Sequence, residues 1–366
     1  MSNKEQTQSC RLGSVGGQAI IEGVMMRSKK HSAIAVRRMD NHKIAVSRKV
    51  NTSVSDKFKF LKWPLIRGVV NFVESLIQSF ATLTQGTEML GIDYEAETSS
   101  KFDKWLEEHC GKWLVGIISA ISMVLGVLLA LVLFIWLPTA VTNLFFGRYA
   151  VGFGAGVLRS ALEGVLKVVI FIAYIWLTAF IPDMKRVYMY HGAEHKSIFC
   201  YEKGLELTVE NVKAQSRFHP RCGTSFMFAM ILLSIFVGIA FLWAVEAVWL
   251  RTVLKLALLP LTVGVGYEFI RYAGKHDSKA VQILSKPGLW MQNLTTREPD
   301  DEIIEVGITA LKCALPDEFE GFYEECLAAL EADEKAENDG AEETANTENS
   351  EESAETTTPA EDSFEA

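Results

Sequence analysis

WLVGIISAISMVLGVLLALVLFIWL, residues 113–137, is a run of 25 residues without a charged side chain. As a helix rising about 1.5 Å per residue, it is longer than the roughly 30 Å hydrocarbon core of a bilayer. In a soluble protein such a helix would have to be buried on all sides. The run therefore predicts a transmembrane helix and decides the class of the fold.

Three further apolar segments follow this run, at about 164–181, 226–250 and 253–273. The last is the weakest, because it is interrupted by Lys255, Pro260, Glu268 and Arg271. A re-entrant segment is the alternative there. We expect about four transmembrane helices, arranged as a first pair over 113–181 and a second pair over 226–273.

The basic residues are distributed unevenly between the connections. They precede the first apolar segment, separate the second from the third and follow the fourth, whereas the other two connections hold few. By the positive-inside rule, both termini and the connection 182–225 are cytoplasmic. The first 20 residues lack the apolar core of a cleavable signal peptide. We expect a multi-pass protein of the cytoplasmic membrane.

The segments before the spans predict a small α+β element on the cytoplasmic side. Residues 33–38 and 43–48 alternate in the manner of strands around a turn, which predicts a hairpin within a β-containing element at 1–60. Apolar residues then recur with a helical period in the region 61–112. They predict an amphipathic helix that lies on the membrane surface or on the β element.

The segments after the spans divide into a helical part and a tail. Pro299 and the acidic residues after it predict a helix over about 303–315, within a cytoplasmic segment at 274–330. The tail at 331–366 carries −13 of the total formal charge of −9, which leaves the rest of the chain at +4. Its composition predicts disorder. A mildly basic body suits a protein that lies against anionic lipids.

The connection 182–225 holds the densest group of potential metal ligands, and we expect it to be a His-rich metal loop. Three of the seven histidines fall within 29 positions. His191 and His195 are four residues apart, so on a helix they would share one face. The order His-x-x-Glu-His, completed by Glu194, matches inverted zinc peptidases, in which the glutamate activates a water. Five residues alone do not establish a peptidase.

The stretch His219-Pro220-Arg221-Cys222-Gly223 is similar to a zinc knuckle in which histidine replaces the first cysteine. The candidate ligands are therefore His191, His195, His219 and Cys222. Four protein ligands would form a closed structural site, whereas three and a water would form an open catalytic one. The sequence leaves both open, as it does a polar loop held by hydrogen bonds alone. Glu194 is the candidate base, or the acceptor of a hydrogen bond from a ligand imidazole.

Three other residues are site candidates. Glu268 is an ionisable group within an apolar span, which suggests a function, although an ion pair with Arg271 would account for it equally well. Glu22 belongs to the glycine-dense stretch 16–27, whose backbone can approach a ligand closely or simply turn into the sheet. Arg221 belongs to the knuckle.

Four stretches carry a family resemblance: GGQAIIEGVMMR at 16–27, YHGAEHKSIFC at 190–200, ENVKAQSRFHPRCGTSF at 210–226 and LWMQNLTTREPDDEIIEV at 289–306. From about residue 13 to 315 the chain resembles the bacterial YqhQ family of membrane proteins. That family is described as predicted metal-dependent enzymes of unknown activity. The resemblance implies a metal and a membrane and supplies no substrate.

These observations predict an α-helical polytopic membrane protein that is a metal-dependent enzyme, a hydrolase acting at the cytoplasmic face. In it His191, His195 and His219 hold zinc, Cys222 is a fourth or alternate ligand and Glu194 is the general base. The substrate would be a lipid or a membrane protein. The alternative is a non-enzymatic scaffold, insertion factor or carrier with a structural zinc site. Nucleic-acid binding is not expected, and the oligomeric state is left open.

Overall fold

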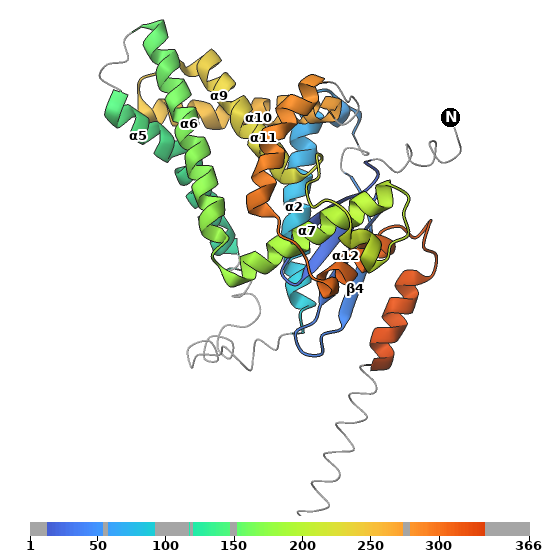
Figure 1. Cartoon of the computed structure of the whole chain (residues 1–366). Helices are drawn as coiled ribbons and strands as arrows, with labels where there is room; N and C mark the ends of the chain where they lie inside the picture. Colours follow the sequence, from blue (N-terminus) through green and yellow to red (C-terminus); the bar gives the residue numbers. More distant parts are fainter. Residues whose placement is uncertain are drawn as a thin grey trace, which may run out of the picture.

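The computed structural model describes residues 13–53, 58–91, 120–146, 152–273 and 279–333, together with residue 117. Over this part the chain is mostly helical, with one four-stranded sheet. Long helices form one end of the molecule, and the sheet with several helices forms the other (Figure 1). The start of the first predicted span, the region 92–112 and the acidic tail from residue 334 lie outside the described residues.

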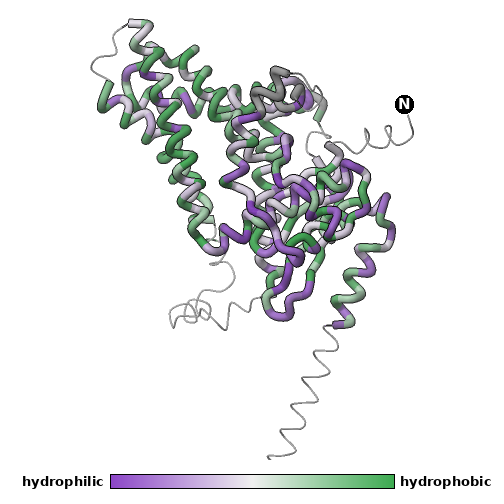
Figure 2. Tube along the Cα trace, in the orientation of Figure 1, coloured by the Kyte–Doolittle hydropathy of each residue, from purple (hydrophilic) through white to green (hydrophobic). Residues whose placement is uncertain are grey.

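Four helical stretches of the described chain are long and apolar enough to cross a membrane. They are Ala120–Phe146, which includes η3 (Val132–Trp136) and α5 (Leu137–Phe146), then α6 (Phe153–Thr178), α9 (Gly223–Leu242) and the Val248–Phe269 part of α10 (Val248–Ala273). At most 22% of the apolar window of each is buried inside the protein. The apolar composition of these helices, green in Figure 2, together with their low burial, suggests a membrane protein.

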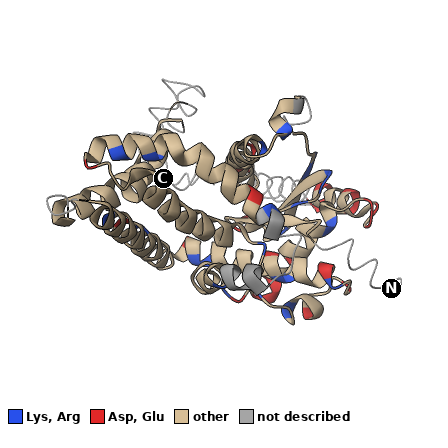
Figure 3. Ribbon diagram, turned by 90° about the horizontal axis from the view of Figure 1, so that it is seen from above, with Lys and Arg blue, Asp and Glu red and all other residues tan. Residues whose placement is uncertain are grey.

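The number and order of these helices agree with the prediction, while their limits differ. The first continues beyond residue 137 to Phe146, and the second begins at Phe153 rather than near 164. The additional turns contain polar residues such as Asn143 and Arg159 that a search for apolar runs excludes. Figure 3 shows that charged residues are sparse on these helices and gather around the sheet.

The sheet is an antiparallel meander of β1 (Gly16–Ile20), β2 (Gly23–Arg27), β3 (His31–Arg37) and β4 (Ile44–Val50). The predicted hairpin is confirmed as β3 and β4, with Arg37 opposite Ile44. The glycine-dense stretch 16–27 forms a second hairpin, in whose turn Glu22 has a φ of 49°. Alternate residues of the strands point to opposite faces of the sheet.

One face of the sheet forms the main core with α7 (Pro182–Glu202), α8 (Val209–Lys213) and α12 (Asp301–Cys313). Segment 182–202 of the expected His-rich metal loop is thus a largely buried helix. The predicted helix near 303–315 is confirmed as α12, and the Asp300 side chain caps it by accepting a hydrogen bond from the Ile303 N–H. The residues of the main core include Val24, Met26, Ala35, Tyr190, Ala193, Ile198, Ile304 and Leu311.

Two helices connect the sheet to the long helices. The other face of the sheet packs on Leu90 at the end of α2 (Ile66–Glu88), whose first turns pack on α10. Helix α11 (Lys279–Thr295) packs on α9, where Gly288 lies against Ser225. Since α9 starts directly after Cys222, the knuckle lies where the sheet and the long helices meet.

Candidate metal centre

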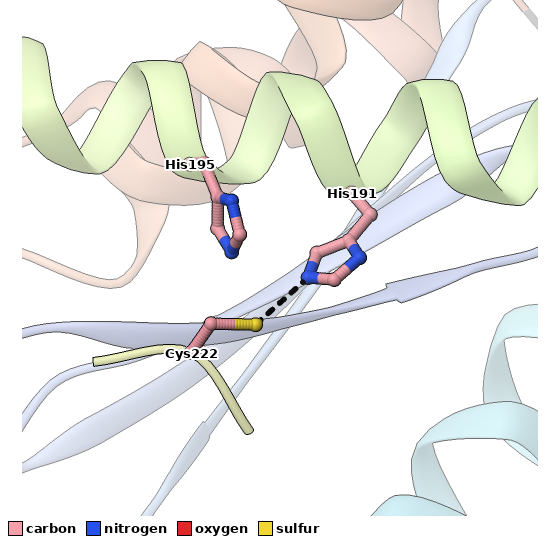
Figure 4. A group of neighbouring side chains, drawn as sticks. All are labelled: His191, His195 and Cys222. Atoms are coloured by element: carbon pink, nitrogen blue, oxygen red, sulfur yellow. Dashed lines mark hydrogen bonds between the residues drawn. The ribbon is translucent and has the colours of Figure 1, made fainter. Parts of the chain in front are cut away.

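His191, His195 and Cys222 come together between α7 and the start of α9 (Figure 4). One potential ligand atom from each lies within 4.8 Å of those of the other two. The histidines are one helical turn apart, so their rings are neighbours, with centroids 4.4 Å apart. Cys222 precedes the first turn of α9, which brings its thiol to the same point. We call these three residues the ligand trio.

Hydrogen bonds fix the tautomers of both histidines. His191 Nδ1 lies 2.8 Å from the Thr295 carbonyl oxygen, and His195 Nδ1 lies 2.5 Å from that of Arg217. Because a carbonyl oxygen only accepts, each Nδ1 donates, and the lone pair of each neutral ring is on Nε2. Histidines that bind metals are typically oriented in this way.

The Nε2 atom of His195 also has the surroundings of a metal ligand. It is buried and makes no hydrogen bond within the described part of the chain. Burial lowers the pKa of His195, which keeps the ring neutral. A buried nitrogen lone pair without a donor is costly, and a metal ion would satisfy it.

Cys222 supplies a sulfur donor at the edge of the site. Its Sγ lies 3.2 Å from His191 Nε2 and accepts a hydrogen bond from the Thr224 N–H. Cysteine binds metals as the thiolate. Two imidazoles and one thiolate fit zinc and leave one position of a tetrahedron free. His191 keeps 13% of its side chain exposed, so the trio is not sealed from its surroundings.

Glu194 lies beside the trio without belonging to it. Its Oε2 is 3.9 Å from His191 Nε2. Burial raises the pKa of Glu194 to about 6, although His191 and the Gly17 N–H act in the opposite direction. A Cβ at Gly17 would lie only 2.7 Å from Glu194 Cγ. The glycine-dense stretch therefore brings the backbone of β1 directly onto this carboxyl group.

His219 has a different partner from the ligand trio. The Arg221 N–H donates to His219 Nδ1 at 3.3 Å, so the ring proton is on Nε2, which faces Glu202 Oε2 at 3.4 Å. The Arg221 side chain and the Gly13 N–H also bind this carboxylate. Burial alone would raise the pKa of Glu202, but these donors together lower it. Of the four ligand candidates, the structure gathers three and directs the fourth to Glu202.

Sequence reasoning missed Glu202, although a signal for it existed. Glu202 follows His195 by seven residues on α7, which is about two helical turns and so places it along the same side of the helix. It was not considered because the segment was expected to be a loop. It holds His219 and Arg221, and thus the chain entering α9, against α7.

Glu22 and Glu268 lie outside the trio and link elements of the fold. The Glu22 carboxylate binds the Arg186 guanidinium through both oxygens and accepts from the Tyr190 hydroxyl, which attaches the β1–β2 turn to α7. Glu268 binds Arg67 of α2 at 2.6 and 2.5 Å. The expected partner of Glu268, Arg271, is therefore not the residue that forms the ion pair.

A second set of charged residues was not anticipated. Arg251 of α10 is fully buried and binds Glu163 of α6 at 2.9 Å, and Lys255 pairs with the same carboxylate. Arg159, also buried, donates to Asn143 and to the backbone carbonyls of Val245 and Glu246. The spacings Arg159–Glu163 and Arg251–Lys255, one helical turn each, were the available signal.

Comparison with known proteins gives the family. The family described as "Protein of unknown function (DUF1385)" matches residues 63–317. A protein of Bacillus subtilis (strain 168), "Uncharacterized protein YqhQ", is 36% identical over 298 residues, which cover 80% of this chain and 89% of that protein. No solved structure matches the chain. The family match extends over the long helices and the ligand trio, and the chain belongs to the YqhQ family.

Proposed function

We propose that this protein is a zinc-dependent hydrolase of the cytoplasmic membrane whose metal is held by His191, His195 and Cys222. The supporting observation is the pair of imidazoles whose Nδ1 protons are bound to carbonyl groups and whose Nε2 atoms lie beside one thiol. This ligand set is narrower than the sequence suggested. Without His219, three protein ligands remain, and an open site is the catalytic form.

The residues around the trio suit hydrolysis. A zinc ion bound there would supply Lewis acidity and lower the pKa of a bound water. Glu194, buried and 3.9 Å from His191 Nε2, is placed to take up the proton of that water. Burial keeps this carboxyl group from being solvated, which favours its use as a proton acceptor near neutral pH.

The position of the trio supports a substrate that comes from the membrane. Cys222 immediately precedes α9, one of the four helices that are long and apolar enough to span. In the orientation given by the positive-inside rule, this end of α9 is cytoplasmic, and so are both termini. The substrate is then a lipid of the inner leaflet or a membrane protein segment near it.

Metal analysis of the purified full-length chain tests the ligand set. We expect about one zinc per chain, as in other single sites. His191→Ala, His195→Ala and Cys222→Ser should lose it, whereas His219→Gln should keep it because His219 binds Glu202. A wild-type chain without stoichiometric metal would contradict the proposal. If the His219→Gln single variant also lost the metal, His219 would have to be counted as a ligand.

A structural zinc site in a non-enzymatic membrane protein is the second candidate. One observation favours it: the trio joins α7 of the sheet end to Cys222, the residue just before α9, so a bound ion would tie the two ends of the molecule together. Glu194→Gln separates the candidates. In an enzyme this variant folds, binds zinc and fails to complement a deletion strain, whereas in a structural site it complements and only the ligand variants fail.

A further inference from the structure

Helix α2 exposes apolar residues along one side. Val73, Leu76, Ile77, Phe80 and Leu83 are between 43% and 66% exposed. They recur at helical spacing and therefore form one continuous strip. We call these five residues the α2 ridge.

Ser75, Thr84 and Glu88 of α2 are exposed, but five other polar residues of the helix bond to groups elsewhere in the protein. Their hydrogen bonds are Arg67 to Glu268, Asn71 to Tyr267, Ser53 to Glu74, Gln78 to Ser32 and Gln85 to Ser47. The buried residues of the helix are Gly68, Thr82 and Gly86. A helix on the surface of a soluble domain has the opposite polarity, with its apolar side against the core. The outer side of α2 thus has the composition of a surface in contact with an apolar medium.

The first turns of α2 pack against the end of α10. Gly68 and Gly264 allow the two helices to meet at backbone contact, since a Cβ on Gly68 would lie 3.0 Å from the Gly264 Cα. The contact includes Tyr267 and Glu268, at the end of the stretch Val248–Phe269 that can span a membrane. The ridge therefore starts at the level where that span ends.

The chain that enters α2 has the composition of a membrane interface. Phe58 precedes the short helix η2 (Lys59–Lys62) and Phe60 lies within it, each 53% exposed, and Trp63, which follows it, is 63% exposed. Aromatic rings beside a lysine are typical of the headgroup region, where the rings bury their apolar parts and the ammonium stays in water.

We infer that the α2 ridge is embedded at the boundary between headgroups and acyl chains of the leaflet where α10 ends, so that α2 is an in-plane, lipid-binding helix. Its occupant is phospholipid, because the ridge is an uncharged strip on a helix whose first turns pack against the end of a span. The sheet, bonded to the polar side of α2, is thereby held against the membrane. This inference is independent of the metal centre.

Photocrosslinking of the full-length chain tests the inference. p-Benzoylphenylalanine replaces Ile77 on the ridge in one variant and Ser75, which is also solvent-exposed but lies off the ridge, in the other. Each variant is reconstituted in vesicles of phosphatidylethanolamine and phosphatidylglycerol and irradiated. Intact-mass analysis then distinguishes a lipid adduct from a crosslinked dimer. Phe80→p-benzoylphenylalanine, an aromatic replacement at another exposed ridge position, provides a second probe if the variant at 77 folds poorly.

We expect a lipid adduct at position 77 and at position 80, and none above background at position 75. A dimer formed through position 77 would overturn the inference and make the ridge a contact between two copies. Equal lipid labelling at 75 and 77, or no lipid adduct at any ridge position, would also overturn it.

Discussion

Gly17 is a glycine because the carboxyl group of Glu194 occupies the space beside it. We predict that Gly17→Ala displaces this flexible side chain from His191 and reproduces the effect of Glu194→Gln, with zinc retained and complementation lost. Gly16→Ala is the matched control, since a Cβ there meets nothing within 4 Å. Zinc content and complementation of a deletion strain are the measurements. If the two alanine variants behave alike, the contact with Glu194 is not the reason why position 17 needs a glycine.

Glu202 gives a pH-dependent prediction. Its pKa is lowered from the ordinary value of 4.5, so its contribution to stability is present above that value and is lost as pH falls through the lowered pKa. Glu202→Gln should therefore be less stable than wild type at neutral pH, by about 1–3 kcal/mol for a buried partner left unpaired. The difference should shrink on acidification. Thermal unfolding in detergent over a pH series measures it, and a difference that stays constant with pH would refute the assignment.

Sequence alone identified the residues of the candidate site, but not the residues that form hydrogen bonds with them. His191 and His195 were selected because a four-residue spacing on a helix brings two rings together, and the rings are neighbours. Which of His219 and Cys222 joins them depends on contacts far along the chain: Thr295 orients His191, and Glu202 holds His219. Such pairings follow from tertiary packing and leave no periodic signal. Metal binding itself stays a prediction.

Among the secondary-structure elements, α7 shows where sequence patterns fail. Its residues were expected to lie in a His-rich metal loop, yet they form a helix that is covered on several sides. Its buried polar groups are satisfied one by one: Lys196, for example, donates to the carbonyls of Lys213 and Gln215. By contrast, the helices of the long apolar runs and the β3–β4 hairpin depend on residues close together in the sequence, and both were predicted from it.

The packing of α7 against the segment after α11 is set by Gly192. A Cβ at this position would lie 2.1 Å from the Arg297 carbonyl oxygen, while the Arg297 N–H donates to the Tyr188 carbonyl. We predict that Gly192→Ala separates the segment from α7, moves the Thr295 carbonyl away from His191 and weakens zinc binding, with about 1–3 kcal/mol lost through overpacking. Chelator competition and thermal unfolding measure the two effects.

Gly154, at the start of α6, provides the control for Gly192 because nothing lies within 4 Å of a Cβ there. Gly154→Ala should leave both zinc affinity and the unfolding temperature near the wild-type values, since alanine is the better helix former. Unchanged zinc affinity in Gly192→Ala would mean that Thr295 does not orient His191.

At the scale of the whole molecule, two polar centres lie at opposite ends of the long helices. The ligand trio includes Cys222 at the first end of α9, whereas Arg251 binds the carbonyls of Leu242 and Val245 at its other end. The 20 residues of α9 separate them, or about 30 Å of helix. Glu163 is the carboxylate that joins Arg251 and Lys255, and so links α6 to α10.

We predict that Glu163→Gln destabilises the bundle without altering the metal centre. Removing the carboxylate leaves Arg251 fully buried without its counter-ion, which typically costs about 3–5 kcal/mol. Glu246→Gln is the control, since Glu246 lies at the same end of the bundle and is solvent-exposed. Thermal unfolding in detergent should separate the two variants clearly, while zinc affinity stays the same in both because the trio is a helix length away. A loss of zinc in Glu163→Gln at temperatures where the bundle is intact would instead show that the two centres are coupled through α6 and α9.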